Sequence, residues 1–206
     1  AFGAGMGGVL KLVLLYASCI AGLAAVLICT GGLSGLLSSL KATTLELLPA
    51  SLTGLTDTAE LTARYGSLVA RGAAKDLGSG LSLTLGVLST QTYAQAIWAG
   101  RSDECARKGG LLAAFLAPPL GIAGIAIGLF MRGHYVTQAE LEALTAAGQT
   151  LPEGIGILSS TIQVFPTFVV NHLPVFFAGI VLGTLLITVV GGGAGLSLGV
   201  AATLVE

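Results

Sequence analysis

The longest uninterrupted apolar run of this chain, residues 173–205, contains no charged side chain. Crossing the hydrocarbon core of a bilayer takes about 20 mostly apolar residues, so this run is longer than one upright span requires. Three further mostly apolar stretches are long enough for one span each, at residues 8–28, 80–98 and 109–131. The sequence therefore predicts an all-α integral membrane protein, a single membrane domain with about four transmembrane helices.

Charged side chains are too scarce for a soluble globular protein. They make up 9% of the 206 residues, and the mean hydropathy is +0.92, whereas soluble domains carry roughly a quarter charged residues. We therefore expect the lipid bilayer as a partner and a multi-pass location in the plasma membrane. The formal net charge of −1 argues against a nucleic-acid partner, because no basic surface is present to neutralise phosphates.

Two segments of intermediate polarity, residues 31–79 and 135–172, separate the expected spans. Both contain signals of amphipathic helices, so we expect structured outer loops. In the first segment, one helix is expected around residues 33–48, before Pro49, and a second begins at Asp57 with Glu60 at capping-box spacing. In the second segment, the capping signals are Thr137 with Glu140, and Gly148 as a helix end.

The shortest connection predicts the orientation of the chain in the membrane. Arg101, Arg107 and Lys108 lie between the second and third expected spans. Short basic loops remain cytoplasmic. The two long segments are then expected outside, and both ends of the chain inside.

The sequence offers no set of catalytic residues. His134 and His172 lie at expected span ends, and no Ser–His–Asp set, phosphate loop or metal-ligand spacing is present. The simplest interpretation is that both histidines place a polar ring in the headgroup region of the bilayer and have no further role. We therefore expect neither an enzyme nor a cofactor, and no metal beyond a coupling ion.

Polar side chains inside a span are costly and usually face the bundle interior or a solute path. The second expected span concentrates them at Ser89, Thr90, Gln91 and Gln95. These residues are candidates for a substrate pathway. The alternative is that the two amides, four residues apart on one helix face, bind neighbouring helices by hydrogen bonds.

Two features indicate irregular backbone within spans. Gly191-Gly192-Gly193 lies inside the last span, one turn after Thr188. A bend there would free backbone carbonyls of the kind with which transporters coordinate cations; the alternative is close helix packing. Pro118-Pro119 removes backbone donors from the third span and predicts a kink near its middle.

The stretch from the second to the last span resembles the sodium:solute symporter family. The resemblance covers most of residues 80–205 and is carried by Gly86-Val87-Leu88-Ser89-Thr90-Gln91-Thr92-Tyr93-Ala94-Gln95, Ala99-Gly100-Arg101, Ala106-Arg107-Lys108-Gly109, Phe165-Pro166, Leu173-Pro174 and the step from Gly179 to Gly183. It implies a LeuT-type fold of two five-helix inverted repeats. The chain would be an internal fragment covering core helices five to eight, with residues 135–172 closing over the substrate.

The same resemblance implies sodium-coupled solute symport by alternating access. The second span would be discontinuous between Leu85 and Ser89, and the last span would supply the sodium ligands. Thr188, Gly191 and Gly192 occupy the ligand positions, although the family places adjacent hydroxyl residues where this chain has the two glycines. The implied partners are a small-molecule solute and the remainder of the transporter, without which the fragment is expected not to transport.

The sequence leaves several alternatives open. The solute and the choice between sodium and proton are not specified by these residues. A permease subunit of another transporter class, or a non-transporting membrane scaffold or sensor, also accounts for the apolar composition. The permease should carry a cytoplasmic coupling helix, for which the loop at residues 101–108 is short.

Overall fold

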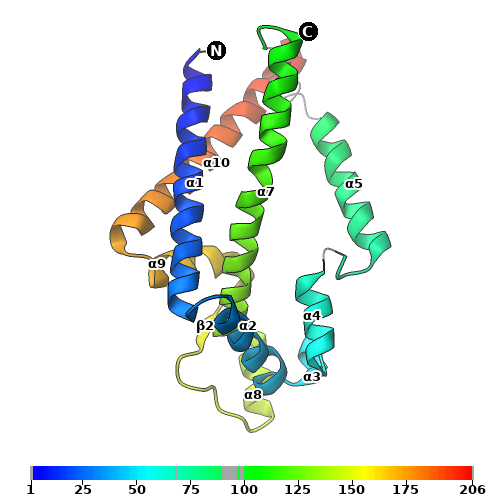
Figure 1. The fold of residues 1–206 in the computed structure, drawn as a ribbon, viewed down its shortest axis with the longest axis vertical. Helices are drawn as coiled ribbons and strands as arrows, with labels where there is room; N and C mark the ends of the chain where they lie inside the picture. The colour runs from blue at the N-terminus through cyan, green and yellow to red at the C-terminus, as the bar shows by residue number, and fades with distance from the viewer. Residues whose placement is uncertain (1, 68, 90–96, 98–99, 206) are drawn as a thin grey trace.

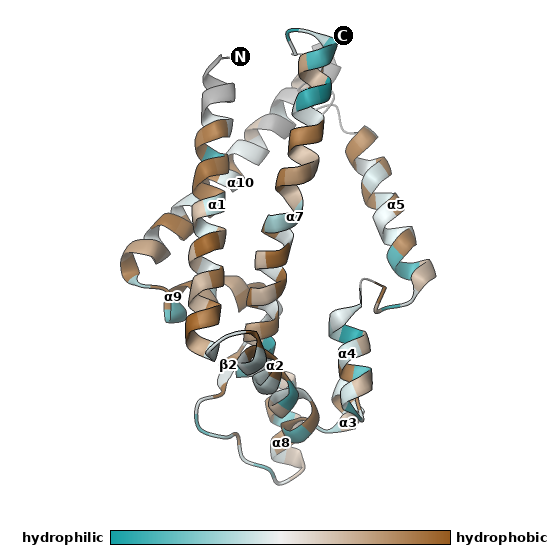
Figure 2. Cartoon of the chain, viewed as in Figure 1, coloured by the Kyte–Doolittle hydropathy of each residue, from teal (hydrophilic) through white to brown (hydrophobic). Residues whose placement is uncertain are grey.

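A computed structural model describes the chain except residues 1, 68, 90–96, 98–99 and 206. Three long helices dominate it: α1 (Phe2–Thr30), α7 (Asp103–His134) and α10 (Val175–Val205). α1 packs against both of the others. α1 and α7 run along the length of the molecule, and α10 crosses it obliquely (Figure 1). Within them, the stretches Gly7–Thr30, Asp103–His134 and Val175–Ala194 are long and apolar enough to cross a membrane. Figure 2 shows many hydrophobic residues, in brown, along these stretches.

The described part of the chain therefore has three candidate spans rather than the four expected. In place of the second expected span stands α5 (Ala73–Ser89), which begins earlier and includes Lys75 and Asp76 in its first turn. These charges and several serines and glycines dilute its hydropathy. Most of the remaining expected span, residues 90–96 and 98, lies outside the described residues. None of the residues of α5 is buried, and the helix stands apart from the three long ones (Figure 1).

The two long segments lie at the same end of the molecule. In Figure 1 the N-terminus, the start of α7 and the end of α10 are at the top, whereas α2, α3, α4 and α8 are at the bottom. The position of the two segments relative to the bilayer stays a prediction, and so does the side that faces the cytoplasm.

The first segment is helical, as predicted. α1 ends at Gly31 and Gly32, whose positive φ angles of 69° and 111° turn the chain sharply, a backbone conformation that glycine adopts without steric cost. The elements that follow are α2 (Leu33–Lys41), the π-helix η1 (Ala42–Leu47), α3 (Ala50–Thr53) and α4 (Thr58–Gly66). Asp57 caps α4 by accepting the Glu60 backbone N–H at 2.8 Å, which confirms this capping signal.

The second segment contains α8 (Gln138–Ala146), η2 (Thr161–Gln163) and α9 (Val164–His172). The capping box of Thr137 and Glu140 is present at the start of α8. Gly148, with φ of 73°, ends the helix, and the N–H of Gln149 donates to the carbonyl of Leu144, as in a Schellman motif. Both predictions are confirmed.

A small sheet was not expected. β1 (Tyr135–Thr137) pairs in parallel with β2 (Gly156–Leu158). Strands this short leave no alternation in the sequence from which to predict them. A side chain at Gly156 would overlap the ring of Tyr135, so the glycine permits the two strands to approach.

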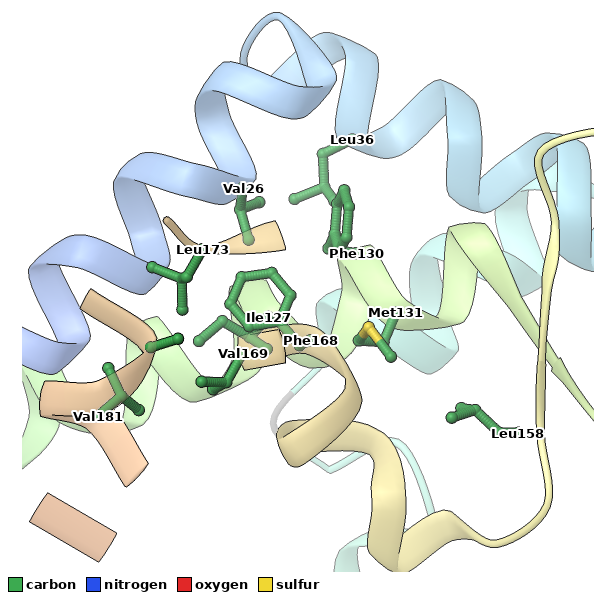
Figure 3. Close-up of a cluster of buried hydrophobic side chains, with 11 residues drawn as sticks. Val26, Leu36, Ile127, Phe130, Met131, Leu158, Phe168, Val169, Leu173 and Val181 are labelled. Atoms are coloured by element: carbon green, nitrogen blue, oxygen red, sulfur yellow. The ribbon is translucent and has the colours of Figure 1, made fainter. Parts of the chain in front are cut away.

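The main apolar core lies where α1, α2, α7, α9 and α10 meet, at the end of the bundle near the outer segments (Figure 3). Its buried residues are Val26, Leu36, Ile127, Phe130, Met131, Leu158, Phe168, Val169, Leu173, Ala178 and Val181. Elsewhere the long helices expose large apolar side chains, such as Phe115 at 78% and Leu186 at 66%. Exposed apolar surface along spanning helices is what a lipid environment would cover.

Neither expected irregularity interrupts its helix. α7 continues through Pro118 and Pro119, and α10 continues through Gly191–Gly193. Where water is excluded, the helical ladder is the only partner for most backbone groups, which keeps weak helix formers helical. The free carbonyls expected at the glycine run are therefore absent from this conformation.

Candidate functional site

The predicted pathway residues are placed only in part. Ser89 is the last residue of α5 and is exposed. Its hydroxyl donates to the carbonyl of Gly86 at 3.0 Å, a bond within its own helix. Thr90, Gln91 and Gln95 lie outside the described residues, so the proposed pathway stays a prediction.

The predicted ion ligands lie on α10, and they differ in environment. The Oγ1 atom of Thr188 is buried and has no hydrogen-bond partner among the described residues. Gly191 and Gly192 are exposed. A Cβ added to either glycine would meet no described atom within 4 Å, so the part of the chain that is described shows no close helix packing there. Of the three, only Thr188 offers a buried polar atom.

A cavity of about 200 Å³ lies inside the bundle one turn from Thr188. It is lined by residues of α1, α7, α9 and α10, including Ser18, Cys19 and Thr184. Ser18 donates to the carbonyl of Leu14 at 2.8 Å, and Thr184 donates to that of Ile180 at 2.7 Å. Both hydroxyls are thus satisfied within their own helices, whereas that of Thr188 is not.

Sequence reasoning found Thr188 but missed Ser18 and Thr184. A signal was present, because Thr184 and Thr188 are four residues apart and so share one helix face. Ser18 gives no comparable signal, since its approach to α10 depends on how the helices pack. Hydroxyl oxygens that line a cavity can hold a water molecule or a cation.

A second polar cluster lies beside the main core, at the end of the bundle. The hydroxyl of Tyr135 lies 3.0 Å from Nε2 of His172, and Nδ2 of Asn171 donates to the same hydroxyl at 3.2 Å. The ring of His172 packs edge-on to Phe130, with centroids 4.8 Å apart. This tyrosine and this histidine join β1 to the end of α9.

His134 belongs to the same cluster. Its ring stacks on Phe130 at a centroid distance of 4.3 Å, and its Nδ1 lies 2.9 Å from the Phe130 carbonyl, to which it donates. Burial, with a smaller contribution from His134, lowers the pKa of His172 below its ordinary value. The sequence did not reveal this environment of His172, because its partner Tyr135 lies 37 residues away in the chain.

An ion pair fixes α8 to the end of α7. Arg132 and Glu140 approach to 2.8 Å, with side chains 24% and 16% exposed. Glu140 also accepts the backbone N–H of Thr137 at 2.9 Å. One carboxylate thus completes the capping box and holds the outer segment to the membrane helix.

Two hollows lie on the surface near this end. A polar one of about 590 Å³ is lined in part by Glu46, His134 and Glu153. An apolar groove of about 680 Å³ runs along α1 and reaches His172. Within the residues that were placed, no group of three or more His, Cys, Asp or Glu side chains could hold a metal ion.

Comparison of the chain with models of known protein families, with curated proteins and with solved structures finds no match.

Proposed function

We propose that this chain forms part of a secondary active transporter, in which solute symport by alternating access is coupled to an ion, with sodium as the proposed ion. One observation carries the proposal. Thr188 Oγ1 is buried without a partner, at the position where the resemblance to the sodium:solute symporters implies an ion ligand. An unsatisfied buried hydroxyl costs about 1–3 kcal/mol. A cation or water bound at this oxygen would remove that cost.

The surroundings of Thr188 support the same proposal. Ser18 and Thr184 place further hydroxyls at the cavity one turn away, between three helices that can cross a membrane. None of the residues of α5 is buried, so its surface is one that further helices of a transporter could cover. A small-molecule solute and the remainder of the transporter are the proposed partners, and no cofactor is proposed.

This conformation gives less support to the proposed roles of the other site residues. Gly191 and Gly192 lie in a continuous helix, so their carbonyls could serve as ligands only in a state where α10 opens. Ser89, with Thr90, Gln91 and Gln95, is proposed to line the solute pathway. The ion part of the proposal therefore rests on Thr188.

The proposal can be tested without knowledge of the solute, by measuring the charge that moves when the sodium concentration is raised suddenly. The complete protein is reconstituted into liposomes on a solid-supported membrane, and the current is recorded. Thr188→Val removes the hydroxyl at similar volume, whereas Thr188→Ser retains it. We expect sodium-dependent current from the wild type and the serine variant, and at least about a tenfold loss of sodium affinity in the valine variant, equivalent to about 1.4 kcal/mol.

Thr145→Val is the control, because the Thr145 hydroxyl is exposed on α8 and is satisfied inside its own helix. It should retain the current. Wild-type affinity in Thr188→Val would rule out Thr188 as an ion ligand. A current driven by proton jumps instead would identify the proton as the coupling ion, and no current with either ion would favour the scaffold or sensor.

A further inference from the structure

The end of α9 is fastened to β1 by a hydrogen bond between two titratable side chains. Tyr135 and His172 are 37 residues apart in sequence, and the phenol oxygen lies 3.0 Å from the imidazole Nε2. His172 is the last residue of α9, and the backbone becomes extended at Leu173 before α10 begins. The bond therefore lies at the joint between the second outer segment and a membrane-spanning helix.

The hydrogen-bond network specifies the protonation state in which this contact is best satisfied. Asn171 Nδ2 donates to the Tyr135 hydroxyl, which leaves the phenol hydrogen free to donate to Nε2 of His172. Nε2 must then carry no proton, so the imidazole is neutral with its hydrogen on Nδ1; this tautomer is assigned from the network. Protonation of Nε2 would place two donors against one phenol oxygen and would displace the phenol hydrogen.

The groups around His172 also disfavour its charged form. α7 brings His134 and the apolar ring of Phe130 against it, and α1 faces it across the apolar groove with Cys29. The nearby charged pair on α7 and α8, Arg132 with Glu140, is internally compensated. The dipole at the end of α9 favours a cation, whereas burial and His134 act in the opposite direction and lower the pKa of His172.

We propose that Tyr135 and His172 form a proton-sensitive latch, which holds the second outer segment to the α9–α10 joint while His172 is neutral and releases it when His172 is protonated. The latch does not depend on the proposed transport function. Phe130 and Phe168 pack against His172 on two sides and belong to the main core (Figure 3). Release would therefore loosen the core side chains that join α7 to α9.

The sign of the pH dependence follows from the lowered pKa. The unfolded or locally opened chain titrates near the ordinary value of 6.5, and the closed form titrates below it. The latch is therefore fully stabilising above about pH 6.5 and weakens as the pH falls toward the lower pKa of the closed form. One unit below the open-state pKa, at about pH 5.5, the local opening constant can rise by at most about tenfold.

Hydrogen exchange of the full chain in lipid nanodiscs tests the latch. Protection factors of amides in α9 and β1 are measured at about pH 7.5 and about pH 5.5, after correction for the intrinsic exchange rate. We expect wild-type protection to fall severalfold, toward the tenfold ceiling. His172→Gln, which retains an acceptor for the phenol but does not titrate in this range, should remove the fall. His134→Gln should preserve most of the fall, because burial is the larger cause of the lowered pKa of His172.

Tyr135→Phe provides a second variant that removes the partner without changing the charge. Its protection should already be low at about pH 7.5 and should change less with pH. Unchanged wild-type protection between the two pH values would overturn the latch. So would a fall that persists in both His172→Gln and Tyr135→Phe, or one that disappears only in His134→Gln.

Discussion

Thr43 of the π-helix donates its hydroxyl to the Gly133 carbonyl at 2.6 Å, although the two residues are separated by 90 positions in sequence. Gly133 is the penultimate residue of α7, where the last carbonyls of a helix lack partners within it. Thr43 is only 2% exposed. The segment after α1 thus satisfies a carbonyl at the end of α7, a helix long and apolar enough to cross a membrane.

Replacing Thr43 with valine should therefore destabilise the folded chain. The substitution nearly conserves volume but leaves the Gly133 carbonyl without this donor, which should lower the free energy of unfolding by about 1–3 kcal/mol. Thermal unfolding in detergent micelles measures the change. Thr43→Ser should lose less stability, because serine retains the hydroxyl. Equal losses in the two variants would show that the methyl group, not the hydrogen bond, is important.

Gly133→Ala tests the close approach that this contact requires. An added Cβ would lie 3.0 Å from the Leu40 backbone nitrogen and 3.1 Å from the Ser39 carbonyl carbon. Because these atoms belong to the backbone of α2, the strain should destabilise the chain by about 1–3 kcal/mol.

Gly128→Ala is the matched control on the same helix, since its added Cβ meets nothing described within 4 Å. Alanine is the better helix former by up to about 1 kcal/mol, so this variant should be neutral or stabilised. Thermal unfolding of both variants gives the comparison. A stable Gly133→Ala variant would indicate that α2 can move away from α7 without loss.

Glu140 should stabilise the folded chain through two separable interactions, the capping box and the ion pair with Arg132. Glu140→Gln can keep the capping box, which accepts glutamine at this position, but loses the charge that pairs with Arg132. Glu140→Ala loses both. We expect the glutamine variant to lose about 1–2 kcal/mol, between exposed and fully buried ion pairs, and the alanine variant to lose about 1 kcal/mol more.

Equilibrium unfolding of the two Glu140 variants, with Arg132→Met for a double-mutant cycle, measures these contributions. Glu142→Gln is the control, because Glu142 is exposed on the same helix. A Glu140→Gln variant as stable as this control would mean that the Arg132 pair adds nothing to stability.

The features that the sequence predicted correctly depend on local signals. The helix at residues 33–48 is bounded by Gly32 and Pro49, and the capping signals at Asp57 and Thr137 act within one helical turn. Such interactions do not depend on how distant segments pack. The three long apolar runs were recognisable for the same reason, since length and composition suffice for a spanning helix.

The features that were missed require distant residues to meet. The contact between Tyr135 and His172, the bond from Thr43 to Gly133 and the pairing of β1 with β2 have no periodicity or fixed spacing in the sequence. The glycine run at residues 191–193 was a local signal that was over-interpreted. Intrinsic propensity predicts a weak helix there, but the helix is continuous in the structure.

The proline pair of α7 leads to the last prediction. Pro118 and Pro119 have no N–H, so the carbonyls one turn earlier in α7 lose their usual helical donors. The hydroxyl of Tyr16 on α1 donates to the carbonyl of Leu116 in this turn. Leu116 follows Ala114 and Phe115, whose carbonyls are the ones that the two prolines leave without a helical donor. The bond therefore joins α1 to α7 beside this gap in the ladder.

Tyr16→Phe should therefore weaken the packing of α1 against α7. The loss should be about 0.6–2 kcal/mol, the range measured for hydrogen bonds between membrane helices. Unfolding by SDS in mixed micelles measures the difference in unfolding free energy between the variant and the wild type. Tyr65→Phe is the control, since no hydrogen bond of its hydroxyl is found among the described residues. If both variants unfold at the same SDS fraction as the wild type, the bond from Tyr16 to Leu116 adds nothing to the packing of α1 against α7.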